Sequence, residues 1–417
     1  MEKGKKILIL GNGFDLAHGL PTGYKQFLEF CYCLNSIYTF ENKGNNDEFY
    51  NRYIKELDTH DLIKNELKEV FDSRSVTFQN YQDGTRAIEV SSSNIVVEEI
   101  RNCLKNNIWF WFFYNLFQSN LLKGINWIDF ESEISNVISF VDRNIEDLMT
   151  PCTEIYEQMI FRHKDIKQIN IFGNLCKNLY ENKGKWRLLE LREQWYCDLE
   201  CLIRALELYL SYFVERIPID RKIEYISDIN PDYVITFNYT NTYERIYHKN
   251  EEVFYIHGRC MQERMAEENN MVLGIDEYWK DDECDEHTNF AIFKKFVQRI
   301  RKKTGVNHYR YMKEVEKIFS ESGFVWSGNI DKYTTYSDGT SVVYVFGHSL
   351  DVTDKDVLKI FFESNETAIK IFCKDKGAEG ELIAKMIKII HEKTLIEKSN
   401  QLPPRVEFIN QERLENN

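Results

Sequence analysis

Apolar runs that end in short polar motifs recur along the chain and predict the strands of a sheet. Runs of strand length, rich in apolar and β-branched residues, occupy residues 7–10, 233–237, 253–256, 342–346, 369–373 and 406–409. Segments with helical spacing separate the later runs, as at residues 354–364 and 379–394. Strands that alternate with helices are typical of a doubly wound, mostly parallel sheet. We therefore predict an α/β fold.

Between the first apolar run and the others, the hydrophobic pattern is mostly helical. Helical spacing is found in residues 24–35, 48–72, 94–122, 127–142 and 144–216, and a polar loop or small hairpin is expected at 73–93. We predict one α/β domain formed by residues 1–30 and 225–417. Residues 31–224 would form an insertion that caps the sheet, regulates it or joins copies of the chain into a homo-oligomer.

Two unusual segments are given structural interpretations at this stage. The aromatic run at residues 108–117 is about half as long as a membrane-spanning helix requires, so we expect it in the core, with an oligomer contact as the alternative. The basic residues of segment 290–303 are interpreted as the solvated face of a helix, with contact to a polyanion or a protein partner as the alternative.

Composition and charge narrow the classes of partner. The chain has 417 residues and a net charge of −14, which argues against a dedicated nucleic-acid binder and against an anionic membrane surface. The N-terminal residues lead directly into the first apolar run, so we expect no secretory signal. The ten cysteines form no Cys-x-x-Cys pair, which is typical of scattered thiols in a reducing compartment. We expect a cytoplasmic protein without a metal site.

The first apolar run breaks into a glycine-rich turn at Gly11, Asn12 and Gly13, and a helix is expected to follow. Such a turn brings backbone N–H groups close to a phosphate. The motif is imperfect, because Leu16 occupies the third small position. Alone, it fits an ordinary strand-to-helix turn equally well.

Three more polar motifs directly follow apolar runs, namely Asn238-Tyr239-Thr240, His257-Gly258 and Gly347-His348-Ser349-Leu350. Each one singly fits a turn or a helix cap. Because the carboxyl ends of parallel strands meet at one edge of a sheet, the motifs together predict a binding site. Asn238 offers a donor and an acceptor to ribose hydroxyls or a water, and His257 can accept a proton near neutral pH.

Three carboxylates complete the candidate chemistry. Asp15 follows the glycine turn and either caps the first helix or faces the site. Asp129 and Glu131 begin the helix at 127–142, where carboxylates suit the helix dipole. Their alternative role is that of an acid or a ribose ligand in a cleft.

These motifs resemble two known families. The segments NGFDLAHGLPT, TFNYTNTYE, the later IHG and FGHSLDVTD, together with WIDFE, are similar to the bacteriophage abortive-infection AbiH family. In the same order, the glycine turn with Gly19-Leu20-Pro21, the segment Thr236-Phe237-Asn238, His257-Gly258 and the Gly347 motif resemble sirtuins. The resemblance implies a Rossmann-like, sirtuin-like fold.

The resemblance implies NAD as the substrate and cleavage of its nicotinamide–ribose bond, so that NAD loss halts a phage-infected cell. Asn238 would position the ribose or the attacking water, His257 would be the base, and Asp15 would act beside them. The residues implied in cofactor binding are Gly11, Asn12, Gly13, Phe14, Gly347, His348 and Ser349. A phage-derived trigger would activate the enzyme.

The chain departs from the sirtuin pattern at two of these positions. Sirtuins carry an aspartate two residues past the asparagine, where this chain has Thr240, and a serine where it has Asp15. Two alternatives therefore stay open. One is a sensor that binds a nucleotide without turnover, and the other is a nuclease that uses Asp15, Asp129 or Glu131 with a metal ion.

Overall fold

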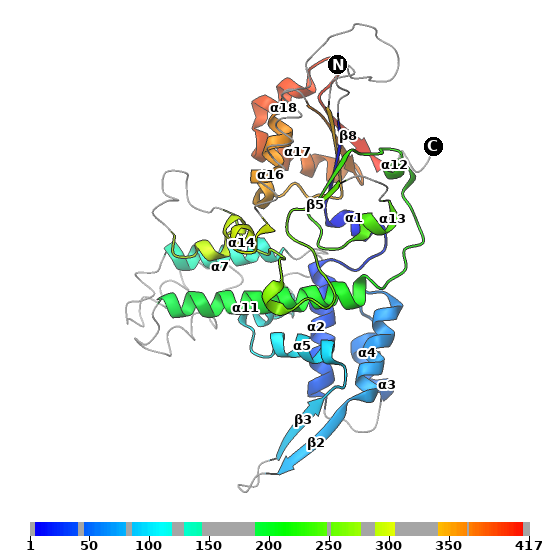
Figure 1. Ribbon diagram of the computed structural model, residues 1–417, viewed down its shortest axis with the longest axis vertical. Helices are drawn as coiled ribbons and strands as arrows, with labels where there is room; N and C mark the ends of the chain where they lie inside the picture. Colours follow the sequence, from blue (N-terminus) through cyan, green and yellow to red (C-terminus); the bar gives the residue numbers. More distant parts are fainter. Residues whose placement is uncertain are drawn as a thin grey trace.

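The computed structural model describes residues 5–40, 46–80, 86–118, 129–143, 188–247, 252–276, 288–304, 341–364 and 367–411. Helices expected within 144–187 lie outside these residues. The described part of the chain is mixed α/β, with a six-stranded parallel sheet and many helices (Figure 1). The α/β fold expected from the apolar runs is therefore confirmed.

The sheet places the first apolar run at its centre. Its strands lie in the order β5-β4-β1-β6-β7-β8, and every neighbouring pair is parallel. They span β1 (Lys6–Leu10), β4 (Tyr233–Thr236), β5 (Glu252–Tyr255), β6 (Ser341–Phe346), β7 (Thr367–Cys373) and β8 (Val406–Asn410). The apolar residues of β1 are fully buried, as expected for a parallel strand that is covered on both faces.

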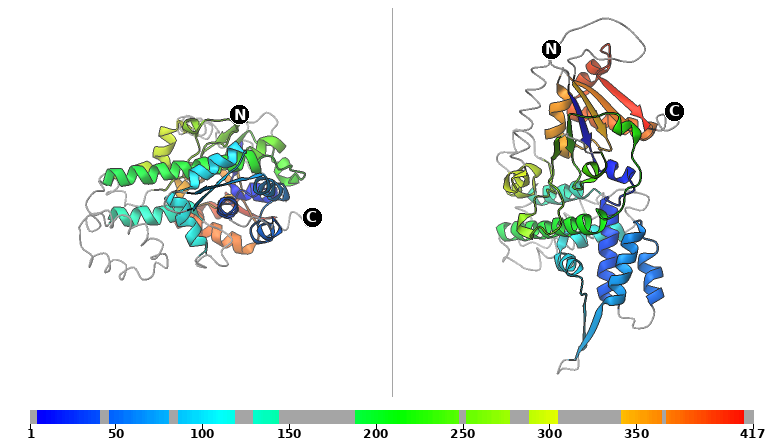
Figure 2. Two further views of the ribbon diagram at one scale, coloured as in Figure 1. Left: turned by 90° about the horizontal axis from the view of Figure 1, so that it is seen from below. Right: turned by 45° about the vertical axis from the view of Figure 1, so that its right-hand side comes forward.

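Helices cover both faces of the sheet (Figure 2). On one face, apolar side chains of α16 (Lys355–Glu363), α17 (Lys376–Ile390) and α18 (Glu392–Ser399) share a core with the strands. On the other face, the covering helices are α1 (Asn12–Ala17), α12 (Glu224–Ser227) and α13 (Thr242–Ile246). Helices are needed on both faces, because a parallel strand buries side chains on either side of the sheet.

A separate core holds the helical region, which lies beyond the carboxyl edge of the sheet (Figure 1). Its helices are α2 (Tyr24–Thr39), α3 (Asn46–Phe49), the π-helix Tyr50–Ile54, α4 (Asp61–Ser73), α5 (Ile95–Leu104), α6 (Ile108–Gln118), α7 (Phe130–Arg143), α11 (Leu188–Tyr209), the π-helix Leu210–Val214 and α14 (Lys295–Arg301). Single 3₁₀ turns occupy Ala266–Glu268, Ala291–Phe293 and Val352–Asp354. The domain boundaries near residues 30 and 225 stay a prediction.

The region expected to be a loop or hairpin forms the hairpin of β2 (Ser75–Asn80) and β3 (Arg86–Ser91). The aromatic run is mostly buried, as expected, with Trp109 and Phe113 in the core and Trp111 37% exposed. No helix among the described residues is both long and apolar enough to span a membrane.

The single helix expected over residues 94–122 is wrong, because the chain forms α5 and α6 with a break at Asn107. The Asn107 side chain accepts from the N–H of Phe110 (3.0 Å) and donates to the carbonyl of Asp198 on α11 (2.6 Å). Asparagine is a strong cap residue. It ends one helix, starts the next and joins both to α11.

Two glycine turns pack against each other at the carboxyl edge of β1 and β6. The N–H groups of Gly11 and Gly13 donate to the carbonyls of Phe346 (3.1 Å) and Gly347 (2.8 Å). Gly347 has φ +68°, and a Cβ there would lie 2.3 Å from the backbone nitrogen of Phe14. The contact therefore requires glycine for both space and backbone conformation.

Replacing Gly347 with alanine should destabilise the protein by about 2 kcal/mol or more, because the added Cβ meets backbone and the residue stays in the left-handed region. The matched control is Gly380→Ala in α17, where an added Cβ meets nothing within 4 Å. That change should stabilise the fold by roughly 0.5–1 kcal/mol. Urea unfolding measures both free energies, and equal values for the two variants would contradict the packing of the turns.

Candidate active site

A cavity of about 830 Å³ lies at the carboxyl edge of the sheet. Residues at or just past the ends of all six strands line it, namely Gly11, Asn238, His257, Gly347, Lys374 and Gln411. Asp129 and Glu131 at the start of α7 and Leu206 and Leu210 near the end of α11 line it from the helical region. The cavity is thus shared by the sheet and the helices that cover its carboxyl edge.

The structure brings together almost every residue that the sequence proposed for the site. The lining includes Gly11, Asn12, Gly13, Asp15, Asn238, His257, Gly347, His348 and Ser349. Phe14 is the exception, because its ring is fully buried against Phe346, His18 and Tyr247 in the core beneath the site. The Phe14 ring thus anchors the short helix α1, and contact between Phe14 and a cofactor stays a prediction.

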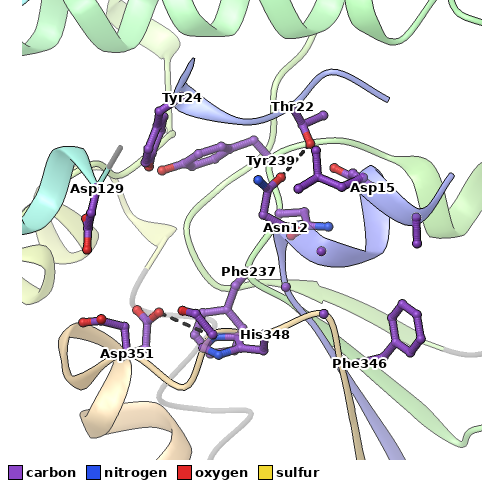
Figure 3. Close-up of a pocket in the computed structure, with 18 of the residues that line it drawn as sticks. Asn12, Asp15, Thr22, Tyr24, Asp129, Phe237, Tyr239, Phe346, His348 and Asp351 are labelled. Carbon is purple, nitrogen blue, oxygen red and sulfur yellow. Dashed lines mark hydrogen bonds and ion pairs between the residues drawn. The ribbon is translucent and has the colours of Figure 1, made fainter. Parts of the chain in front are cut away.

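The glycine turn differs from a free phosphate cradle. Besides the two glycine N–H groups that donate to β6 and its turn, the N–H of Phe14 donates to the carbonyl of Gly11 (2.9 Å). Asn12 accepts through its side chain from Thr22 Oγ1 (2.6 Å), as Figure 3 shows. Gly11 and Gly13 therefore serve the packing of the two turns, and their N–H groups are already engaged.

Asp15 is a buried carboxylate that faces the turn after β4. Thr240 Oγ1 donates to its Oδ2 at 2.5 Å, while its Oδ1 has no hydrogen-bond partner among the described residues. The side chain is 1% exposed. Burial raises the pKa of Asp15 to about 6, although the hydrogen bond from Thr240 favours the ionised form.

Asn238 and His257, like Asp15, are buried and have one polar side-chain atom without a hydrogen-bond partner among the described residues. They are 5% and 4% exposed, and Asn238 Oδ1 and His257 Nδ1 also lack partners in the described part of the chain. A buried polar atom without a partner costs free energy and calls for an explanation. Three such atoms line one cavity, at the ends of three neighbouring strands, which indicates a polar ligand.

His257 is oriented by Asp354, which follows β6. His257 Nε2 lies 3.0 Å from Asp354 Oδ1. Although burial favours the neutral acid, Lys295 and His257 hold the pKa of Asp354 well below its usual range. An ionised carboxylate only accepts, so Nε2 carries the hydrogen and Nδ1 is left as an acceptor.

Lys295 ties this pair to the helical region. Its Nζ lies 2.7 Å from Asp354 Oδ1 and 2.8 Å from Glu131 Oε2, and the side chain is 3% exposed. Burial and the Lys295 charge lower the pKa of His257 to about 4, so the imidazole is neutral at pH 7. Burial raises the pKa of Glu131 to about 7, against the attraction of Lys295.

These contacts correct the interpretation of the basic segment 290–303 as a solvated face. Lys295 and Arg299 are buried, and Arg299 pairs with Asp356. Lys302 pairs with Glu200 at 2.8 Å. The segment does contain a helix, α14, as expected. Its buried ion pairs could not be predicted, because a run of charges alone does not reveal which carboxylates will face it.

The histidines of the sequence motifs have different surroundings. His18 lies outside the cavity lining and bonds through its ring nitrogens to the Phe14 carbonyl and the Tyr247 hydroxyl, both at 2.7 Å. His348 lines the cavity, and its Nδ1 accepts from the N–H of Leu350 (2.9 Å). Its Nε2 lies 3.5 Å from Asp354 Oδ2. His348 Nε2 therefore lies beside the same carboxylate as His257 Nε2.

Sequence reasoning missed Asp354, Lys295, Tyr24 and Tyr239 as site residues. From the sequence, Asp354 was interpreted only as the first residue of a helix, although it belongs to the segment FGHSLDVTD. Tyr24 and Tyr239 line the cavity, and Figure 3 shows their hydroxyl groups directed toward each other. Spacing in the sequence gave no signal for Lys295, because its partners lie more than 50 residues away.

No group of three or more histidine, cysteine, aspartate or glutamate side chains in the described ranges is arranged to hold a metal ion. The carboxylates considered for a metal have other partners. Asp15 accepts from Thr240, and Glu131 pairs with Lys295. Asp129 accepts from Ser132 Oγ (2.7 Å) as the cap of α7, which agrees with the structural role considered for it.

Replacing Asp15 with asparagine should stabilise the protein above pH 6. The folded-state pKa is raised from 3.8 to about 6, so the folded state holds more protons, and stability falls as pH rises between these values. The full effect is about 3 kcal/mol. Urea unfolding at pH 4 and pH 8 should give similar stabilities at the lower pH and a more stable variant at the higher one. Asp220→Asn, an exposed control, should change neither, and an Asp15→Asn variant less stable at pH 8 would contradict the burial of an unfavourable charge.

Most of the chain matches a known protein family. A family model described as bacteriophage abortive infection AbiH matches residues 7–374, from the central strand to the end of β7, including the helical region. No curated protein and no solved structure matches the chain. The match indicates a function in abortive infection, which is an antiviral defence. The chain belongs to the bacteriophage abortive infection AbiH family.

Proposed function

We propose that this AbiH protein binds NAD or a closely related dinucleotide in the cavity and hydrolyses its nicotinamide–ribose bond. Loss of NAD would then halt the infected cell, in line with the family's role in abortive infection. The observation that carries the proposal is the set of three buried side chains, Asp15, Asn238 and His257, each with one unpartnered polar atom at the cavity.

The sheet supports a dinucleotide as the ligand. Numbered along the chain, its strands lie in the order 3-2-1-4-5-6, which is the order of doubly wound dinucleotide-binding folds. In such folds, ligands bind at the carboxyl edge where the strand order reverses. That point lies between β1 and β6, where Gly11 and Gly347 line the cavity. The Rossmann-like, sirtuin-like assignment belongs to this proposal.

The departures from the sirtuin pattern compensate each other. Thr240 stands where sirtuins have an aspartate, and Asp15 stands where they have a serine. In this structure the two side chains are joined by a hydrogen bond of 2.5 Å. The carboxylate beside the asparagine therefore comes from the turn after β1 instead of the turn after β4.

The proposed reaction assigns one role to each of the three side chains. The bond between ribose C1′ and the nicotinamide nitrogen breaks, and its electron pair leaves with neutral nicotinamide. Water attacks the cationic C1′ and loses its proton to Nδ1 of His257, while Nε2–H stays bonded to Asp354. Asn238 holds the ribose or the water, and the Asp15 carboxylate stabilises the cationic ribose above pH 6.

A toxic hydrolase needs an inactive state, and the helical region is the proposed regulator. It contributes Glu131, Leu206 and Leu210 to the cavity and is joined to the sheet edge through Lys295. A phage-derived trigger or association with other copies of the chain would act by moving this cover.

Replacing His257 with glutamine should lower nicotinamide release at least about 100-fold, because the water loses its proton acceptor. Glutamine keeps a polar side chain toward Asp354, so the fold should survive. Chromatography of NAD incubated with purified protein, with and without phage-infected lysate, measures the release. His391→Gln, an exposed histidine between α17 and α18, is the matched control and should be unaffected.

Three outcomes would overturn the hydrolase proposal. Nicotinamide release that is unchanged in His257→Gln excludes His257 as the base. Tight NAD binding without cleavage, with phage protection retained in His257→Gln, points to a sensor that binds without turnover. Metal-dependent degradation of RNA or DNA, lost on substitution of Asp15 or Glu131, points to the nuclease alternative.

A further inference from the structure

The charged side chains around the cavity are unequally distributed. The lining carries the carboxylates Asp15, Asp129, Glu131, Asp351, Asp354 and Glu381, whereas its lysines are Lys374 and Lys385. Asp354 and Glu131 lie at the His257 end, where Lys295 joins them. Lys374 directly follows β7, and Lys385 lies on α17. The cavity therefore has an acidic end and a lysine end.

The sheet order sets the distance between these ends. His257 follows β5 and Lys374 follows β7, and three strands lie between their strands. Four strand spacings of about 4.8 Å separate the two backbone positions by about 19 Å along the edge, and the side chains of His257 and the lysines cover part of this distance. In Figure 3, Asp129 and Asp351 lie on the opposite side of the site from Phe346, whose ring packs against Phe372 of β7 (5.7 Å). A ligand that contacts both ends must be elongated.

Three backbone N–H groups of the glycine turn are already hydrogen-bonded within the chain, so the lysine end is the stronger candidate for binding an anion. The N–H groups of Gly11, Gly13 and Phe14 already donate to backbone carbonyls. The first turn of α17 is also capped, because Asp375 accepts from the N–H of Ala378 (2.9 Å). These four amides at the starts of α1 and α17 are therefore already engaged, so we consider side chains as the groups that could hold an anion.

We propose that Lys374 and Lys385 form a diphosphate subsite, so that the cavity selects elongated ligands with a cationic group at one end and a diphosphate toward the other. Neither lysine makes an ion pair with any residue in the described part of the chain. NAD matches this polarity, because its nicotinamide is cationic and its diphosphate is anionic. The subsite adds a diphosphate-binding role to the proposed function. The assignment of nicotinamide as the cationic group rests on that proposed function.

Glu381 places a negative charge next to the proposed lysine subsite. It lies one helical turn before Lys385 on α17 and lines the same cavity. Residues four apart on a helix are neighbours, so this carboxylate opposes an anion held by Lys385. The subsite therefore predicts effects of opposite sign for the lysines and for Glu381.

Isothermal titration of the full chain with ADP-ribose tests the subsite without requiring NAD cleavage. The double variant Lys374→Ala/Lys385→Ala should bind ADP-ribose about tenfold or more weakly, because both charged contacts to the diphosphate are lost. Glu381→Gln should bind about two- to threefold more tightly. Lys388→Ala is the matched control, because Lys388 is on α17 and outside the cavity lining, and it should bind like the wild type.

Two results would overturn the subsite. One is the absence of ADP-ribose binding by the wild-type chain, and the other is binding that neither the double variant nor Glu381→Gln changes. Binding that depends on the lysines, without nicotinamide release from NAD, would support the subsite while the proposed hydrolysis fails. The two proposals can therefore be separated by the same set of variants.

Discussion

One buried carboxylate, Asp354, holds the site together. Its Oδ1 accepts from His257 Nε2 (3.0 Å) and from Lys295 Nζ (2.7 Å), and Lys295 also reaches Glu131 in the helical region. A buried charge is tolerated only when it is paired and hydrogen-bonded. The turn after β5, the turn after β6 and the helices α7 and α14 are thus obliged to meet at this point.

The same contact determines the chemistry available to His257. The ionised Asp354 fixes the hydrogen on Nε2 and leaves Nδ1 facing the cavity without a partner. Burial and the charge of Lys295 both lower the pKa of the imidazole, because each opposes its protonation. Any movement of the helical region that withdraws Lys295 would make His257 a stronger base. In the proposed function, one set of charges would therefore join regulation and catalysis.

Local patterns were enough to predict the sheet and the residues at its edge. Asn238, His257 and Gly347 each follow a buried strand, and parallel strands necessarily bring such positions together. Asp354 and Lys295 could not be predicted in the same way, because their roles depend on contacts between distant helices. The burial of the Phe14 ring could not be predicted either, because the direction of a side chain in a short helix is set by the core beneath it.

The glycines show how one pattern serves two purposes. Gly11 and Gly13 suit a phosphate turn, yet in the structure they allow close packing against Gly347. In the proposed subsite, anion binding is left to Lys374 and Lys385, at the other end of the cavity from His257. The charge of the cavity, more than its glycine motif, is the reason for proposing an elongated ligand of mixed charge.

The most direct test of the account is a crystal structure of the full chain with an NAD analogue whose nicotinamide–ribose bond resists cleavage. The account predicts that ribose C1′ lies beside Asn238 and Nδ1 of His257, with Asp15 near the ribose and the diphosphate at Lys374 and Lys385. An analogue bound in the reverse direction, or outside this cavity, would contradict it.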